Sequence, residues 1–190
     1  MKILILLFLL TSFLPGLIFQ KNSYKSCVKI SRSEFEHHQP VFSFIKNSKR
    51  SIKHNGIIRI KTANKNIVLK DDREFQEYRY LGELTTAPFI LIHELEPNTE
   101  EYYLINKETA HIDTLVRKPI FFKNGSDIVC LEGSGTDMKQ RIQFGQIANG
   151  RFRTKHLFTL KKDISPDYVY WFDTNSIFIK EGKNYWRLNF

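Results

Sequence analysis

The sequence has few of the residues that usually mark a reaction or a helical fold. Of its 190 residues, two are cysteine, four are alanine and nine are glycine. It contains no Cys-x-x-Cys pair, no glycine-rich phosphate loop and no dinucleotide-binding fingerprint. These absences exclude the enzymes and zinc-binding proteins that such local motifs identify. We therefore predict no catalytic residue, no metal ligand and no cofactor.

The scarcity of alanine, together with 16 phenylalanines and 8 tyrosines, favours β-strands over helices. The clearest pattern lies between residues 118 and 160, where Asn124-Gly125 and Asn149-Gly150 each separate two apolar runs. Asn-Gly is the strongest short-range hairpin signal, because both central residues of a type I′ turn need a positive φ. We therefore expect four consecutive antiparallel strands in this region.

Similar runs occur on both sides of this unit. They predict a hairpin at 57–69, a four-stranded meander at about 75–116, and three strands from residue 168 to the end of the sequence. Units of about 43 to 50 residues are typical of propeller blades. We expect an all-β fold of propeller-like meanders, with a β-sandwich as the alternative, and the hairpin at 57–69 would complete the three-stranded last unit.

The sequence of one unit resembles a known repeat. Residues 118–128 and 140–147 resemble a blade of the WD-type β-propellers, in which a strand enters through a proline and turns at a glycine-containing pair. Gly145 stands where such a blade carries tryptophan, and the Gly-His and Trp-Asp signatures are absent. The chain is also similar to a family of uncharacterised exported bacterial proteins through two tyrosine-rich strands, Tyr78–Gly82 and Tyr102–Asn106. The resemblance covers about residues 75–190. It implies a fold and a location outside the cytoplasm but no activity.

The one long apolar run of the sequence follows Met1-Lys2 and extends from Ile3 to Phe19. One positive residue before a short apolar run is the layout of a secretory signal peptide. The run is a little short for a membrane-spanning helix, which needs about 20 apolar residues. We expect residues 1–20 to be a signal peptide, or alternatively an uncleaved anchor, and the protein to be exported to the periplasm or the extracellular space.

Charge is unevenly distributed along the sequence, whose net charge is +9. Residues 21–70 include 12 basic and 2 acidic residues, whereas residues 71–110 include 3 basic and 10 acidic residues. We interpret residues 21–55 as a basic, loosely structured segment that precedes an all-β domain at 56–190. An exported protein of this kind is expected to bind a protein or a glycan and no nucleic acid. We expect membrane contact only through an uncleaved leader.

The two cysteines are far apart in the sequence. In an oxidising compartment Cys27 and Cys130 would be able to form a disulfide. Such a bond would close a loop of about 100 residues and stabilise the fold by about 4–5 kcal/mol in the chain-entropy model. The alternative is that Cys130, within the apolar run Ile128–Leu131, is a small buried core residue.

Three groups of residues are candidates for chemistry or binding. His93 shares a strand face with Phe89 and Leu91, as a hydrogen-bonded core histidine would, with a catalytic base as the alternative. The acidic residues between Glu94 and Glu101 flank a Pro97-Asn98 turn, where paired carboxylates would bind a cation or act on a glycosidic bond, or simply be solvated. On the final strands, Tyr170, Tyr185 and Arg187 form a candidate binding patch, with packing against a neighbouring sheet as the alternative.

Other residues give weaker signals. His37 and His38 are adjacent, so in an extended segment they point to opposite faces and do not predict a shared metal ion. Ser134 lies in a loop between hairpins and lacks the context of a nucleophile elbow. The sequence therefore predicts a non-catalytic binding or protein-interaction module. The alternatives are a periplasmic hydrolase that acts on sugar or peptide through residues 94–101, and an inhibitor or immunity protein.

Overall fold

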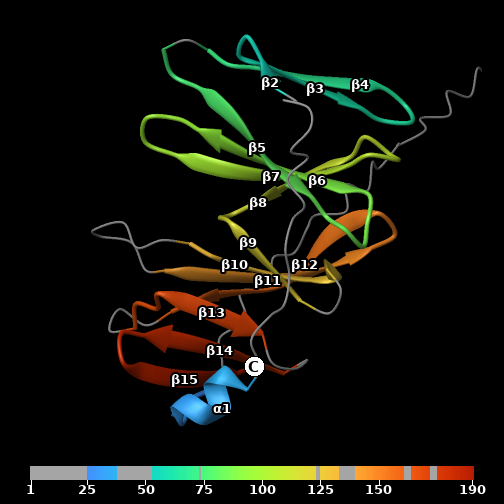
Figure 1. Ribbon diagram of the computed structural model, residues 1–190. Helices are drawn as coiled ribbons and strands as arrows, with labels where there is room; N and C mark the ends of the chain where they lie inside the picture. Colours follow the sequence, from blue (N-terminus) through green and yellow to red (C-terminus); the bar gives the residue numbers. More distant parts are fainter. Residues whose placement is uncertain are drawn as a thin grey trace, which may run out of the picture.

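The computed structural model describes residues 25–37, 53–72, 74–122, 125–132, 140–160, 164–171 and 175–190, except for the side chains of Tyr170 and Trp171. The expected leader at 1–20 lies outside these residues. Four antiparallel sheets of three or four strands are arranged one above another (Figure 1). This arrangement confirms the prediction of an all-β fold built from antiparallel meanders. The described helical residues form no segment of the length and apolar character that crossing a membrane requires.

The first sheet has three strands: β2 (Lys53–His54), β3 (Ile57–Lys61) and β4 (Asn66–Lys70). Strands β3 and β4 confirm the hairpin predicted at 57–69. Strand β2 precedes them through a two-residue turn, Asn55-Gly56, in which both residues have a positive φ. This is the same Asn-Gly signal that identifies hairpins elsewhere in the chain, and it adds β2 to the two strands predicted at 57–69.

The second and third sheets are the two predicted four-stranded meanders. The second contains β5 (Glu77–Glu83), β6 (Phe89–Leu95), β7 (Glu100–Asn106) and β8 (Ile112–Leu115). The third contains β9 (Pro119–Phe122), β10 (Asp127–Leu131), β11 (Arg141–Ala148) and β12 (Arg151–Thr159). Asn149 and Gly150 have φ values of 53° and 71°, so the second predicted Asn-Gly turn is of the I′ kind.

The fourth sheet combines both ends of the described chain. Its strands are β13 (Tyr168–Trp171), β14 (Ser176–Glu181), β15 (Asn184–Asn189) and β1 (Ser26–Lys29). Strand β1 pairs with β15, so the expectation that the hairpin at 57–69 completes this sheet is wrong. The inward side chains of that hairpin, Ile58, Ile60 and Ile67, pack instead on the second sheet.

A separate hydrophobic core fills each of the three spaces between neighbouring sheets. Ile58 and Ile92 belong to the core between the first and second sheets, and Leu104 and Ile128 to the core between the second and third. Val129 belongs to the core between the third and fourth sheets. Because the two middle sheets have cores on both faces, their central strands β6 and β10 carry apolar runs that are buried on both faces.

Gly145 is required by close packing in the third sheet. The pairing of β11 with β12 shifts register between Phe144 and Gly145, which marks a bulge. A Cβ at position 145 would overlap the carbonyl oxygen of Arg153 and the ring of Phe152. A tryptophan, the residue of a WD-type blade at this place, would not fit beside Phe152.

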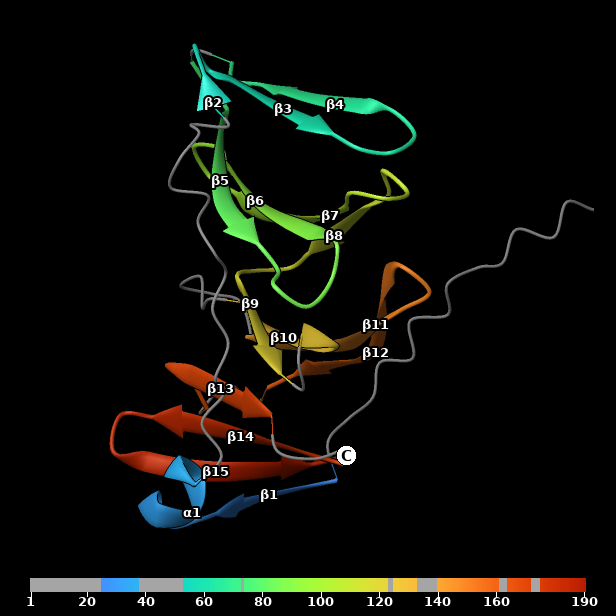
Figure 2. The ribbon, with the colours of Figure 1, turned by 45° about the vertical axis from the view of Figure 1, so that its right-hand side comes forward.

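The two ends of the stack of sheets differ in how they meet solvent. A short helix, α1 (Arg32–Glu36), covers the outer face of the fourth sheet, and its Phe35 is 2% exposed. The first and fourth sheets are at opposite ends of the stack (Figure 2), and no described residue covers the outer face of the first sheet. Elements β1, α1 and β2 are the described parts of the basic segment 21–55.

Candidate functional site

The acidic residues that flank the β6–β7 turn are divided between two faces of the second sheet. His93 and Glu94 are consecutive on β6, so their side chains point to opposite faces. Glu94 and Glu101 are opposite each other in the pairing of β6 with β7 and share one face, whereas Glu100 lies with His93 on the other. The residues between 94 and 101 therefore do not converge on one position.

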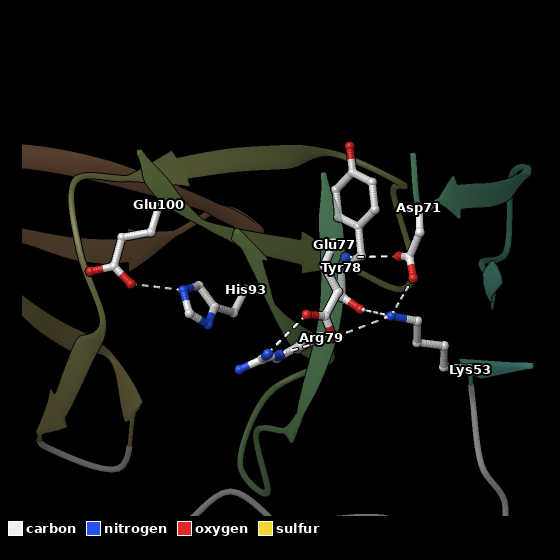
Figure 3. Close-up of polar contacts among 7 residues, drawn as sticks. All are labelled: Lys53, Asp71, Glu77, Tyr78, Arg79, His93 and Glu100. Carbon is white, nitrogen blue, oxygen red and sulfur yellow. Dashed lines mark hydrogen bonds and ion pairs between the residues drawn. The ribbon is translucent and has the colours of Figure 1, made fainter. Parts of the chain in front are cut away.

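The first face carries a cluster around Glu100. One oxygen of Glu100 lies 2.8 Å from Nε2 of His93, and the other accepts a 2.5 Å hydrogen bond from Nη1 of Arg117 (the His93 pair is drawn in Figure 3). The His93 ring stacks on Tyr102 with 4.3 Å between centroids. Burial, and secondarily the charge of Glu100, raises the pKa of Tyr102 to about 12, so this phenol stays protonated at neutral pH.

The opposite face carries a cluster around Glu94, whose exposed fraction is 4%. Glu94 accepts hydrogen bonds from Nε2 of Gln76 and from the hydroxyl of Tyr103, which also contacts Glu101 at 2.9 Å. Burial first, and then the hydrogen bond to Glu94, raises the pKa of Tyr103 above its ordinary value. The described partners of this buried carboxylate are thus neutral donors.

A third polar cluster ties the first sheet to the second. Nζ of Lys53 lies 2.6 Å from Asp71 and 3.7 Å from Glu77, and it donates a 2.7 Å hydrogen bond to the carbonyl oxygen of Tyr78 (Figure 3). Arg79 pairs with Glu77 at 2.8 Å, and this hydrogen bond is the main cause that lowers the pKa of Glu77. Each charge in the cluster has an opposite charge beside it, as in a structural ion-pair network.

The described residues contain no group of three or more histidine, cysteine, aspartate or glutamate side chains that is positioned to hold a metal ion. Of the weaker candidates, His37 follows α1 directly, while His38 and Ser134 lie outside the described residues. Nε2 of His111 lies 3.0 Å from Oδ1 of Asp113, and Nδ1 of His111 lies 3.1 Å from Nη2 of Arg151. This arrangement links β8 to β12 across two sheets.

The predicted disulfide is not formed in this structure. Cys130 is completely buried, and burial raises the pKa of its thiol to about 12. Its side chain belongs to the core between the second and third sheets, whereas Cys27 packs against the core between the third and fourth. Because Cys130 points away from the sheet that contains Cys27, the two Cβ atoms do not approach as a disulfide requires.

Two of the three residues of the predicted binding patch contact helix α1. The ring of Tyr185 lies 4.8 Å from that of Phe35, and Nη1 of Arg187 lies 3.6 Å from a carboxylate oxygen of Glu34. Tyr170 is on β13 in register with Phe178, but its side chain lies outside the described residues. The structure thus brings Tyr185 and Arg187 together beneath the helix.

An exposed basic surface lies at the other end of the stack. We name it the basic face and define it by Arg59 and Lys61 on β3 and Val68 and Lys70 on β4. Val68 is 55% exposed and lies opposite Arg59 in the strand pairing, with Lys61 and Lys70 further along their strands. None of the three cations forms an ion pair within the described part of the chain.

The alternation of Ile58 and Ile60 with Arg59 and Lys61 is visible in the sequence. The sequence does not show, however, that the polar side of this strand lies at an end of the molecule.

Comparisons of the chain with protein-family models, with curated proteins and with solved structures gave no match. The similarity to WD-type blades therefore stays a prediction.

Proposed function

We propose that this protein is a non-catalytic binding module and that the basic face is its binding surface. The observation that carries the proposal is the contrast between the two ends of the stack. Phe35 covers the outer face of the fourth sheet, whereas Arg59, Lys61 and Lys70 stand exposed and without ion pairs to described residues around Val68. By comparison, Lys53, Lys107 and Arg117 each pair with an acidic neighbour, whereas Arg153 and Lys155 on β12 are exposed like the residues of the basic face.

The composition of the basic face favours a protein partner with an acidic surface. An apolar centre surrounded by charged residues is the usual anatomy of a protein–protein interface. Three positive side chains around Val68 would complement a cluster of aspartate and glutamate residues and speed the encounter with it. With a cleaved or anchoring leader, as the first 20 residues suggest, this partner would be met outside the cytoplasm.

The test uses a charge-reversal variant of the basic face and a matched control. Arg59→Glu combined with Lys61→Glu changes the net charge by the same amount as Arg153→Glu combined with Lys155→Glu. The control residues are exposed on β12, in another sheet. The full-length wild type and both variants are immobilised and exposed to envelope extract of the source cells at moderate salt, and a retained protein is purified for affinity measurements.

We expect the wild type and the control to retain the same acidic protein. The variant of the basic face should bind it about tenfold more weakly or worse, equivalent to about 1.4 kcal/mol or more. Binding to the wild type should also weaken as salt is added. Equal retention by all three proteins, or retention of polysaccharide alone, would reject the basic face as a protein-binding surface.

A further inference from the structure

The N-terminal part of the described chain is attached to the fourth sheet in the manner of a bound peptide. We name residues 25–37 the clasp; it consists of β1, helix α1 and their flanking residues. Its backbone extends the sheet along β15, with Lys25 N donating to Asn189 O at 2.7 Å and Ile30 N donating to Tyr185 O at 2.9 Å. Adding a strand to a sheet edge is a common mode of peptide recognition.

Side chains of α1 fix the clasp in one place on the outer face of the sheet. The Phe35 ring is buried between Tyr185, at 4.8 Å, and Phe178, at 6.5 Å. Glu34 reaches Arg187, and the side chain of Ser31 caps the helix by accepting a hydrogen bond from Glu34 N at 3.1 Å. The clasp therefore presents an extended strand, an aromatic anchor and a carboxylate in a fixed order.

We propose that the edge of β15, together with Phe178, Tyr185 and Arg187, is a strand-acceptor site that also takes the clasp of a second copy of this chain. A second copy fits this site because its residues 25–37 are identical to the segment that is bound there in the structure. An exchange between two copies leaves each fourth sheet with its full set of strands. It also leaves no exposed strand edge at β15.

The topology places the clasp far from the strand that follows it in sequence. Strand β1 is in the fourth sheet, while β2 is in the first sheet at the opposite end of the stack (Figure 2). Three sheet-to-sheet spacings of about 10 Å each separate these ends. The 15 residues from 38 to 52 have a fully extended length of about 50 Å, which exceeds the about 30 Å that the three spacings add up to.

The same linkage keeps the chain monomeric when it is dilute. A tethered clasp has an effective concentration on the order of millimolar at its own site, so a clasp from another copy competes only at high protein concentration or after the resident clasp is weakened. This inference concerns the fourth sheet alone and does not depend on the basic face.

Cross-linking of two full-length chains tests the exchange. Ser26 and Asn189 are opposite each other in the β1–β15 pairing, and Nδ2 of Asn189 donates to Oγ of Ser26 at 2.8 Å. One chain carries Ser26→Cys as the clasp donor, and a second, tagged chain carries Asn189→Cys as the acceptor. All chains also carry Cys27→Ser, and mild oxidation then reports a donor clasp seated on an acceptor β15. A single chain with both cysteine substitutions is the control for the clasp in its own site.

Placing Phe35→Ala on one chain or the other supplies the matched comparison. On the acceptor chain this substitution weakens the resident clasp, so we expect the yield of cross-linked heterodimer to rise at least threefold. On the donor chain it removes the incoming anchor, and the yield should fall at least threefold. Each mixture contains one chain with Phe35→Ala and one chain that keeps Phe35, so the two mixtures differ only in which chain carries the substitution. Circular dichroism checks that each variant retains its strands.

Two results would overturn the proposal. One is a heterodimer yield that does not depend on which chain carries Phe35→Ala, because random collision would explain it. The other is the absence of heterodimer at millimolar concentration while the single chain with both cysteines closes its own disulfide. In that case the site would accept only the clasp of its own chain.

Discussion

At the scale of single residues, the buried carboxylate of Glu94 depends on Tyr103. The Tyr103 hydroxyl donates to Glu94 from the neighbouring strand, in a place where Glu94 is almost completely buried. Leaving a buried acceptor with one partner fewer costs about 1–3 kcal/mol. We expect Tyr103→Phe to lower the free energy of unfolding by this amount in urea titrations.

Tyr102 supplies the control for this prediction, since it is the adjacent tyrosine on the other face of the same strand. Its hydroxyl lies 3.4 Å from Glu100, a long contact to a carboxylate that also has His93 and Arg117 as partners. Tyr102→Phe should therefore change stability by less than about 0.5 kcal/mol. An equal loss in both variants would show that Glu94 does not require the Tyr103 donor.

His156 links the pH of the solution to stability. Its ring is surrounded by Phe144, Phe158 and Phe190, with centroid distances of 6.0, 5.5 and 4.5 Å. Burial, followed by the positive charge of Lys155, lowers the pKa of His156 below its ordinary value of 6.5. In the unfolded chain the imidazole therefore takes up its proton at a higher pH than in the folded protein.

This difference determines the direction of the pH effect. The contribution of the neutral His156 side chain to the free energy of unfolding is fully present above about pH 6.5. It is lost as pH falls from that value toward the pKa of the folded state, because the unfolded state binds more protons in this range. We expect His156→Phe to keep more of its pH 7.5 stability at pH 5 than the wild type does, measured by urea midpoints at both values. A parallel decline in the two proteins would show that other groups cause the acid sensitivity.

At the scale of strands and turns, local sequence predicts the second and third sheets because each is continuous in the chain and contains its own turns. Asn149-Gly150 forms the turn that its residues require, and apolar runs such as Phe89–Ile92 are buried on both faces as expected. Strand β2 also has a local signal in Asn55-Gly56. The hairpins were thus predictable from backbone preferences and periodicity.

Long-range pairing is the part that sequence patterns do not predict. Strand β1 has only four residues, and its partner β15 lies about 160 positions later in the chain. A short polar segment such as Ser26–Lys29 gives no sign of which sheet edge it will join. For the same reason, the sequence predicts Tyr185 and Arg187 as a surface patch, while their contacts with Phe35 and Glu34 become visible only in the folded molecule.

The candidate site was predictable only in part for a related reason. The alternation of a strand shows which side chains share a face, so the division of Glu94 from Glu100 follows from the sequence once the strands are placed. The same alternation identifies Arg59 and Lys61 as a polar side of β3. Whether that side meets solvent or another sheet depends on the order of the sheets, which no local pattern contains.

At the scale of the whole molecule, the sheets form a linear series in which each core joins only two neighbours. Ile58 lies in the core at the end of the series, and Leu104 lies in the core between the two middle sheets. In such arrays stability is approximately a sum of layers and their interfaces, so a terminal layer opens without disrupting the rest. The fold of this protein should therefore lose its first sheet before its central sheets.

Truncation of one side chain at each position tests this behaviour. Ile58 and Leu104 are both 0% exposed, so Ile58→Ala and Leu104→Ala should each cost about 2–5 kcal/mol at their own interface. We expect Ile58→Ala to speed amide hydrogen exchange in β3 and β4 and to leave β10 and β11 as protected as in the wild type. Leu104→Ala should speed exchange in the second and third sheets together. If Ile58→Ala instead lowered protection equally in all four sheets, the molecule would unfold as one cooperative unit, and the layers would not be separable.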